Sequence, residues 1–107
     1  MDKVIRDGKV AVLVSPGFGA GWSTWASSEF ENWARFSPAV VAWVEGGKTG
    51  DIEELVAAEL GADSYFYVGG ALDLEIEWSP VGTPFIINEY DGSESLQTEG
   101  NTNWCSA

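Results

Sequence analysis

The stretch Val10-Ala11-Val12-Leu13-Val14, followed by Ser15-Pro16-Gly17-Phe18-Gly19-Ala20-Gly21-Trp22, decides the fold. Five consecutive apolar residues, three of them valine, predict a buried strand that is covered on both faces. The proline and the three alternating glycines that follow predict a loop, because neither residue type continues a regular element. Just before the strand, Asp7-Gly8 predicts a tight turn that joins it to a short strand at 4–6.

Three helices are predicted after this loop. Ser27 or Ser28 can cap a helix that runs to about Phe36. Ser37-Pro38 has the pattern of a helix cap followed by a first-turn proline, which predicts a second helix over 39–45. A third helix is predicted over 51–60, because Asp51 and Glu54 form a capping-box pattern and Gly61 can end the helix.

After Gly61 the apolar period changes from 3.6 to 2, which predicts strands. They are expected at 65–68, at 72–78, where apolar and acidic residues alternate, and at 84–90. Asp91-Gly92 predicts a hairpin leading into 93–97. The fold class is therefore α+β: an N-terminal β-hairpin, two or three short helices and a C-terminal antiparallel β-meander, in a single domain over 1–97. Residues 98–107 are predicted to form a polar C-terminal tail.

The composition excludes several classes of function. The 107 residues include 17 acidic and five basic side chains and no histidine, for a formal charge of −12. Residues 49–107 contain neither lysine nor arginine, so direct binding to duplex DNA or to an anionic membrane is disfavoured. Without histidine, and with a single cysteine, the chain lacks the ligands of common zinc sites, a catalytic triad and a disulfide framework. We expect a cytoplasmic protein that is not an enzyme and has no metal or cofactor.

The glycine-rich loop is the first candidate site. It follows a buried strand and precedes helical sequence, where backbone N–H groups gather to hold anions and aromatic rings can stack on a planar ligand. The spacing is neither the dinucleotide fingerprint nor a P-loop. The alternative is a tight connection whose glycines adopt positive φ while its aromatics fill the core. Including one nearby cation, the candidate ligand-binding residues are Gly17, Phe18, Gly19, Gly21, Trp22, Trp25 and Arg35.

Arg35 is the cation best placed to hold a phosphate, because it lies beside Trp33 and Phe36 in the sequence and a guanidinium can stack or form a fork. The alternative is a charge-paired helix end.

A row of carboxylates is the second candidate site. Asp73, Glu75 and Glu77 alternate along a predicted strand, and Glu89 on the returning strand could join them. Alternate strand residues are roughly 6.6–6.8 Å apart, which is too far for three carboxylates to share one metal ion. The row could instead contact a basic partner. The alternative is a solvated strand face that discourages pairing between sheet edges.

The segments 8–13 and 15–22 resemble the opening of a group of short bacteriophage and prophage proteins, with the motif GKVAVL-x-SPGFGAGW. The resemblance extends through Pro38-Ala39-Val40-Val41, the acidic strand at 72–78 and 89–93, and so covers most of the chain to about residue 97. It implies a phage accessory protein acting in the host cell cytoplasm. It identifies no catalytic residue.

Small phage accessory proteins commonly counter host defence, and three mechanisms are open. One is a sponge, a homo-oligomer that binds a nucleotide-derived immune signal in a pocket and withholds it without chemistry. The second is an acidic decoy that blocks a basic host protein by imitating nucleic acid, and electrostatic steering would favour that association. Its acidic face would comprise Asp73, Glu75, Glu77, Glu89, Asp91 and Glu94. The third is a small structural phage protein. The glycine-rich loop favours the sponge, and the charge favours the decoy.

Overall fold

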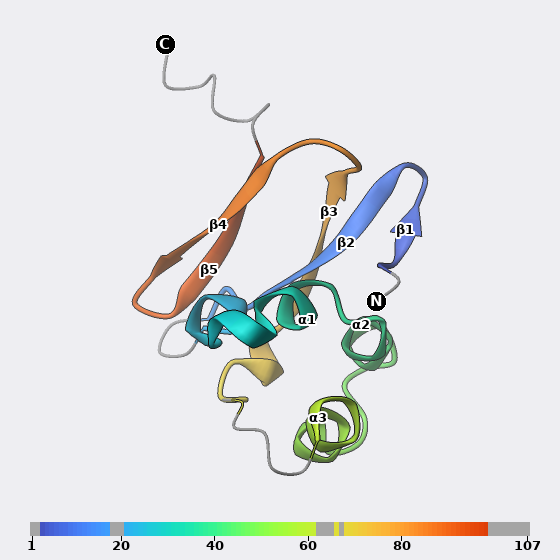
Figure 1. Ribbon diagram of the computed structural model, residues 1–107, viewed down its shortest axis with the longest axis vertical. Helices are drawn as coiled ribbons and strands as arrows, with labels where there is room; N and C mark the ends of the chain where they lie inside the picture. Colours follow the sequence, from blue (N-terminus) through green and yellow to red (C-terminus); the bar gives the residue numbers. More distant parts are fainter. Residues whose placement is uncertain (1–2, 18–20, 62–65, 67, 99–107) are drawn as a thin grey trace.

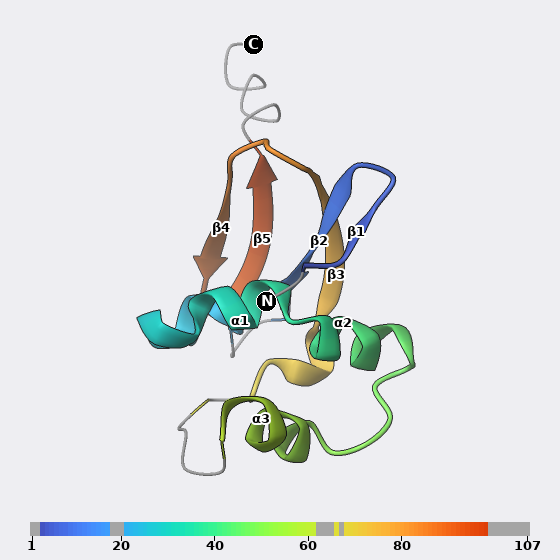
Figure 2. The same ribbon diagram turned by 45° about the vertical axis from the view of Figure 1, so that its right-hand side comes forward.

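The computed structural model describes residues 3–17, 21–61, 66 and 68–98, and it confirms the α+β fold with antiparallel strands toward the C-terminus (Figure 1). The strands lie at one end of the molecule and the helices at the other (Figure 2). In chain order the strands are β1 (Ile5–Arg6), β2 (Lys9–Val14), β3 (Glu75–Pro80), β4 (Phe85–Tyr90) and β5 (Ser93–Thr98). The helices are α1 (Glu31–Phe36), α2 (Pro38–Glu45) and α3 (Ile52–Leu60), with 3-10 turns η1 (Ser23–Trp25), η2 (Ser28–Phe30) and η3 (Ala71–Asp73).

Strand β2 is covered on both faces, as its apolar run predicts. Ala11 and Leu13 point into a core cluster formed with the helices, which includes Trp22 and Trp43. The alternate residues of β2 point into a second cluster that joins Phe36 of α1 to the β4–β5 hairpin. The members of this second cluster are Val10, Val12, Val14, Phe36, Phe85, Ile87 and Leu96. The strand is therefore the central layer between the helices and the hairpin.

Both predicted hairpin turns form, and their backbone angles explain the residues used. Asp7 and Gly8 have φ of 52° and 75°, and Asp91 and Gly92 have φ of 52° and 87°. Two consecutive residues with positive φ make the turn whose twist matches the flanking strands, and Asp-Gly tolerates that conformation. The turns connect β1 to β2 and β4 to β5, with Ile5 opposite Val10 and Tyr90 opposite Ser93.

The helix boundaries follow the predicted capping residues. Ser37 ends α1 and caps α2, where its Oγ accepts a hydrogen bond from the Val40 N–H at 3.3 Å and Pro38 fills the first turn. Asp51 caps α3 by accepting from the Glu53 N–H at 2.9 Å. Gly61 ends α3 with φ of 102°. The sequence over 28–36, predicted as one helix, forms η2 followed by the six-residue α1.

The strand predicted over 72–78 is shifted toward the C-terminus. Leu72 and Asp73 belong to η3, where the Asp73 N–H donates to the Gly70 carbonyl, and β3 begins only at Glu75. The turn forms because Gly69-Gly70 reverses the chain immediately before it. Of the strand predicted at 65–68, Phe66 and Val68 lie in a connection, and residues 65 and 67 lie outside the described residues, as does the predicted tail beyond Thr98.

The five strands form two antiparallel sheets. β3 pairs with β2 to give the order β1-β2-β3, whereas β4 pairs with β5 in a separate two-stranded sheet. The register places Val12 opposite Glu77 and Leu13 opposite Ile76. Strand β2 therefore pairs with β3 in its own sheet and packs against the β4–β5 hairpin. Both partners come from much later in the sequence.

We expect Val12→Ala to lower the free energy of unfolding by about 2 kcal/mol, because the truncation leaves a cavity between β2 and the β4–β5 hairpin. Glu77→Ala, at the exposed position opposite Val12, is the control and should change stability by less than about 0.5 kcal/mol. Urea denaturation followed by tryptophan fluorescence measures both variants. Equal stability of the two would show that the hairpin does not pack on β2.

Candidate functional site

The two described ends of the glycine-rich loop, at Ser15 and Trp22, contact a buried carboxylate that belongs to β5. The side chain of Glu94 is almost fully buried, with 1% of its surface exposed. One carboxylate oxygen accepts from the Ser15 N–H at 2.9 Å. The other accepts from the Trp22 N–H at 2.6 Å and from the N–H and hydroxyl of Thr24 at 3.0 and 2.6 Å. All four donors are neutral groups of the loop and of η1.

These hydrogen bonds explain how a charge can be buried there. Removing a carboxylate from water costs several kcal/mol, and only good hydrogen-bond geometry offsets that cost. Hydrogen bonds to charged groups contribute about 1.5–3 kcal/mol each, so four of them stabilise the buried ion. Two further bonds fasten the same strand to the loop, from the Glu94 N–H to the Ser15 carbonyl at 2.8 Å and from the Ser93 hydroxyl to the Pro16 carbonyl at 2.6 Å.

Backbone N–H groups at the described ends of the loop and in η1 do gather around an anion, but that anion is the protein's own carboxylate and not a ligand. The amides of Trp22 and Thr24 and that of Ser15 are all directed at Glu94. The prediction that Glu94 belongs to the exposed acidic face of a decoy is therefore wrong, because its carboxylate is buried and hydrogen-bonded. One feature of the sequence does indicate that Glu94 faces the core. It lies two residues before Leu96, and residues two apart on a strand point to the same face.

The described glycines of the loop, Gly17 and Gly21, and the aromatic residue Trp22 serve packing. A Cβ on Gly17 would lie 2.2 Å from a carboxylate oxygen of Asp73, and one on Gly21 would lie 2.7 Å from the Trp25 ring. Neither glycine has the positive φ that the packing alternative expected, so close approach explains both. Trp22 is fully buried and donates its indole N–H to the Ala34 carbonyl at 2.7 Å.

Trp22 therefore offers no ring face to a ligand in this arrangement. The Trp25 side chain is 43% exposed. Phe18 and Gly19 lie outside the described residues.

Arg35 lies at a groove between α1 and β4. The groove has a volume of about 550 Å³ and is lined by Asn32, Arg35, Phe36, Thr83, Pro84, Phe85, Ile86 and Ile87. The Arg35 Nε is buried and has no hydrogen-bond partner among the described residues. Its Nη2 lies 3.5 Å from the Glu31 carboxylate, which is long for a charge-assisted hydrogen bond. The predicted ion pair at the helix end is present, but it leaves much of the guanidinium's hydrogen-bonding capacity unused.

The other cations are placed differently. Arg6 forms a two-pronged ion pair with Glu45 at 2.6 and 2.9 Å, and this hydrogen bonding lowers the pKa of the Glu45 carboxyl. Lys48 donates to the Leu72 carbonyl at 2.6 Å. Lys9 is exposed at the start of β2. Lys3 lies 4.3 Å from the centre of the Phe36 ring, close to the groove that Arg35 lines.

The predicted row of carboxylates is divided by the fold. Glu75 and Glu77 are exposed on one face of β3, which is an edge strand. Asp73 precedes that strand in η3, beside Gly17. Glu89 lies in the other sheet, where its carboxylate accepts from the Gly92 N–H at 2.7 Å. Only two of the four acids therefore share a strand face.

Comparisons of the chain with protein-family models, with curated proteins and with solved structures give no match. Within the described residues, no cluster of three acidic or cysteine side chains could hold a metal ion. Nor does any helix in that part of the chain combine the length and the apolar character needed to cross a bilayer.

Replacing Glu94 tests how far the fold depends on its carboxylate. Glu94→Gln keeps the shape but presents an NH₂ group to at least one of the donors, so we expect a loss of about 1–3 kcal/mol in unfolding free energy. Glu94→Ala should cost more, because all four donors lose their acceptor. Glu75→Gln, which changes an exposed acid on β3, is the control. Urea titration that finds Glu94→Gln as stable as the parent would contradict this role.

Proposed function

We propose that the protein binds a small nucleotide-class ligand in the groove beside Arg35 and withholds it without chemistry. The observation that carries this proposal is the Arg35 guanidinium, whose buried Nε lacks a partner in the described structure and whose nearest carboxylate contact is long. A guanidinium that lines the groove, and whose contact with Glu31 is long, can offer charge-assisted hydrogen bonds to an anion bound there. The proposed ligand site is therefore the groove between α1 and β4 and not the glycine-rich loop that the sequence indicated.

The groove suits an anion attached to a planar ring. A guanidinium presents a planar fork of donors that matches the oxygens of a phosphate. Phe36 and Phe85 supply apolar aromatic surface, and Asn32 can donate to and accept from a ring edge. The volume of about 550 Å³ falls within the range of about 300–1,000 Å³ that is usual for small-molecule sites.

Binding without turnover is supported by the groups that line this groove. Apart from the guanidinium, the described lining offers an amide, a hydroxyl and apolar side chains, which hold and orient a ligand better than they transfer protons. Together with the resemblance to phage proteins, this favours a sponge for a nucleotide-derived immune signal in the host cytoplasm. Assembly into a homo-oligomer remains part of the proposal.

A second candidate is the acidic decoy, and one observation favours it. Glu75 and Glu77 are exposed on the same face of an edge strand, while the alternating residues Ile76 and Trp78 pack toward the core. Two carboxylates fixed at this spacing can contact a basic groove on a nucleic-acid-binding protein. The acidic surface of such a decoy would contain fewer carboxylates than the sequence pattern indicates, because Asp73 lies in η3 and Glu89 in the other sheet.

Arg35→Gln should weaken binding of nucleotide ligands by about tenfold or more, because the guanidinium supplies charge-assisted hydrogen bonds. Arg6→Gln removes one positive charge from an exposed ion pair outside this groove, and it is the matched control. Isothermal titration calorimetry with AMP, ADP-ribose, cyclic AMP and cyclic di-AMP measures the affinities. Equal effects of the two substitutions, or no binding of any nucleotide by the parent protein, would refute the site.

For the decoy, the double change Glu75→Lys with Glu77→Lys should abolish co-purification of basic nucleic-acid-binding proteins from host extract. The control is Glu53→Lys with Glu54→Lys on α3, which changes the charge equally at two exposed positions. Mass spectrometry quantifies the captured proteins. If both pairs reduce capture equally, binding follows net charge and the β3 face is not a specific site.

A further inference from the structure

A second groove adjoins the one beside Arg35. It has a volume of about 330 Å³ and is lined by Lys3, Ile5, Val10, Phe36, Pro80, Val81, Gly82, Thr83 and Phe85. Phe36, Thr83 and Phe85 line both grooves. The rings of Phe36 and Phe85 meet edge to face, with their centres 6.1 Å apart. The two grooves therefore form one continuous surface with this aromatic pair between them.

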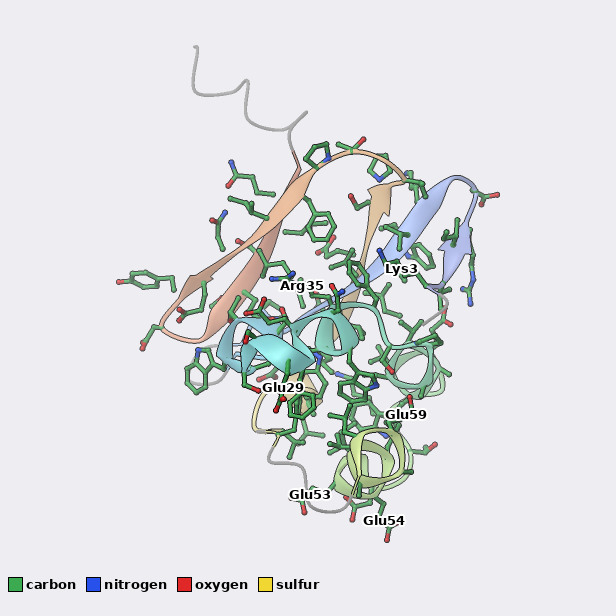
Figure 3. The ribbon with its side chains drawn as sticks, in the orientation of Figure 1. Lys3, Glu29, Arg35, Glu53, Glu54 and Glu59 are labelled. Carbon is green, nitrogen blue, oxygen red and sulfur yellow. The ribbon has the colours of Figure 1, made fainter. Side chains whose placement is uncertain are left out.

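The charge of this surface differs from that of the rest of the molecule. The chain has 17 acidic residues and only five cations, yet two cations and no acid are found among the described residues lining the two grooves. Figure 3 shows Arg35 and Lys3 near each other on the side of α1 toward the strands, whereas Glu53 and Glu54 lie at the far end, on α3. A groove lining with two cations favours an anion despite the net charge, because salt screens charges beyond about 8–10 Å, and Glu31 is the acid that contacts Arg35 at 3.5 Å.

Each groove has its own cation. Arg35 lines the larger groove and Lys3 the smaller one. The Lys3 ammonium lies over the Phe36 ring, 4.3 Å from its centre. A cation–π contact of this kind fixes the position of the ammonium without requiring a conventional acceptor for its N–H groups. Lys3 is thus held beside the aromatic pair with donors left for a ligand.

We infer that the ligand has two separate anionic groups, one held by Arg35 and the other by Lys3, with the connecting part of the ligand against Phe36 and Phe85. This inference rests on the proposed function and narrows its ligand class. Nucleotides with two phosphates set apart across a ring, as in a cyclic dinucleotide, fit it. Those with a single phosphodiester reach only one of the two cations.

The test compares cyclic di-AMP, which has two phosphodiesters, with cyclic AMP, which has one. Lys3→Met keeps an unbranched apolar side chain against Phe36 and removes only the charge. Lys3→Met should weaken the binding of cyclic di-AMP about fivefold or more and leave the affinity for cyclic AMP within about twofold of the parent value. Lys9→Met makes the same change of charge at an exposed position outside both grooves and is the matched control. Lys3→Arg should restore most of the affinity for cyclic di-AMP.

The outcomes separate this inference from the proposed function. If Arg35→Gln weakens both nucleotides but Lys3→Met weakens neither, or weakens both equally, the ligand site stands and the second anionic contact is overturned. If the parent protein binds none of AMP, ADP-ribose, cyclic AMP and cyclic di-AMP, or if Arg35→Gln has no effect, the proposed function fails and this inference fails with it. If the parent protein binds AMP or ADP-ribose but not cyclic di-AMP, only this inference is overturned. Equal melting temperatures of the parent and Lys3→Met confirm that the variant is folded.

Discussion

The hydrogen bonds between Glu94 and the glycine-rich loop are the constraint on which the rest of the structure depends. The oxygens of a carboxylate buried away from water need hydrogen-bond donors. Glu94 therefore holds the amides of Ser15, Trp22 and Thr24 close together. The loop then leads directly into Trp22, which is fully buried in the helical core cluster. On the other side, the same residue fastens the β4–β5 hairpin beside β2. One side chain thereby couples the two core clusters.

The hydrogen bonding of this carboxylate by neutral donors also determines where a ligand anion can bind. Amides that already hold a carboxylate have little capacity left for a phosphate, so the motif most suggestive of anion binding serves the architecture. The unused capacity lies instead at Arg35, whose guanidinium lines a groove formed by α1 and the hairpin. The position of the hairpin, and so the groove, depends in turn on Glu94. The β4–β5 hairpin therefore contributes both to the stability of the fold, through Glu94, and to the groove of the proposed ligand site.

Local chemistry made much of the fold predictable. Asp7-Gly8 and Asp91-Gly92 specify turns with positive φ, Ser37-Pro38 specifies a helix start, and the run Val10–Val14 specifies a strand with two covered faces. Strand pairing could not be predicted, because register depends on contacts between residues far apart in sequence. For that reason Glu75 and Glu89 were expected on neighbouring strands but lie in separate sheets. Arg35 was identified as a candidate, whereas the groove beside it depends on Phe85 and Ile87, which only tertiary packing brings there.

The distance along the chain between the loop and its carboxylate has a consequence for biosynthesis. Ser15 and Glu94 are 79 residues apart, and Trp22 and Glu94 are 72 apart. Contacts of such long range form late, because the intervening chain must first lose its freedom. On a ribosome the glycine-rich loop is made early, and its amides stay hydrated until β5 has emerged. The N-terminal strand therefore cannot complete its native environment until β5 has been made.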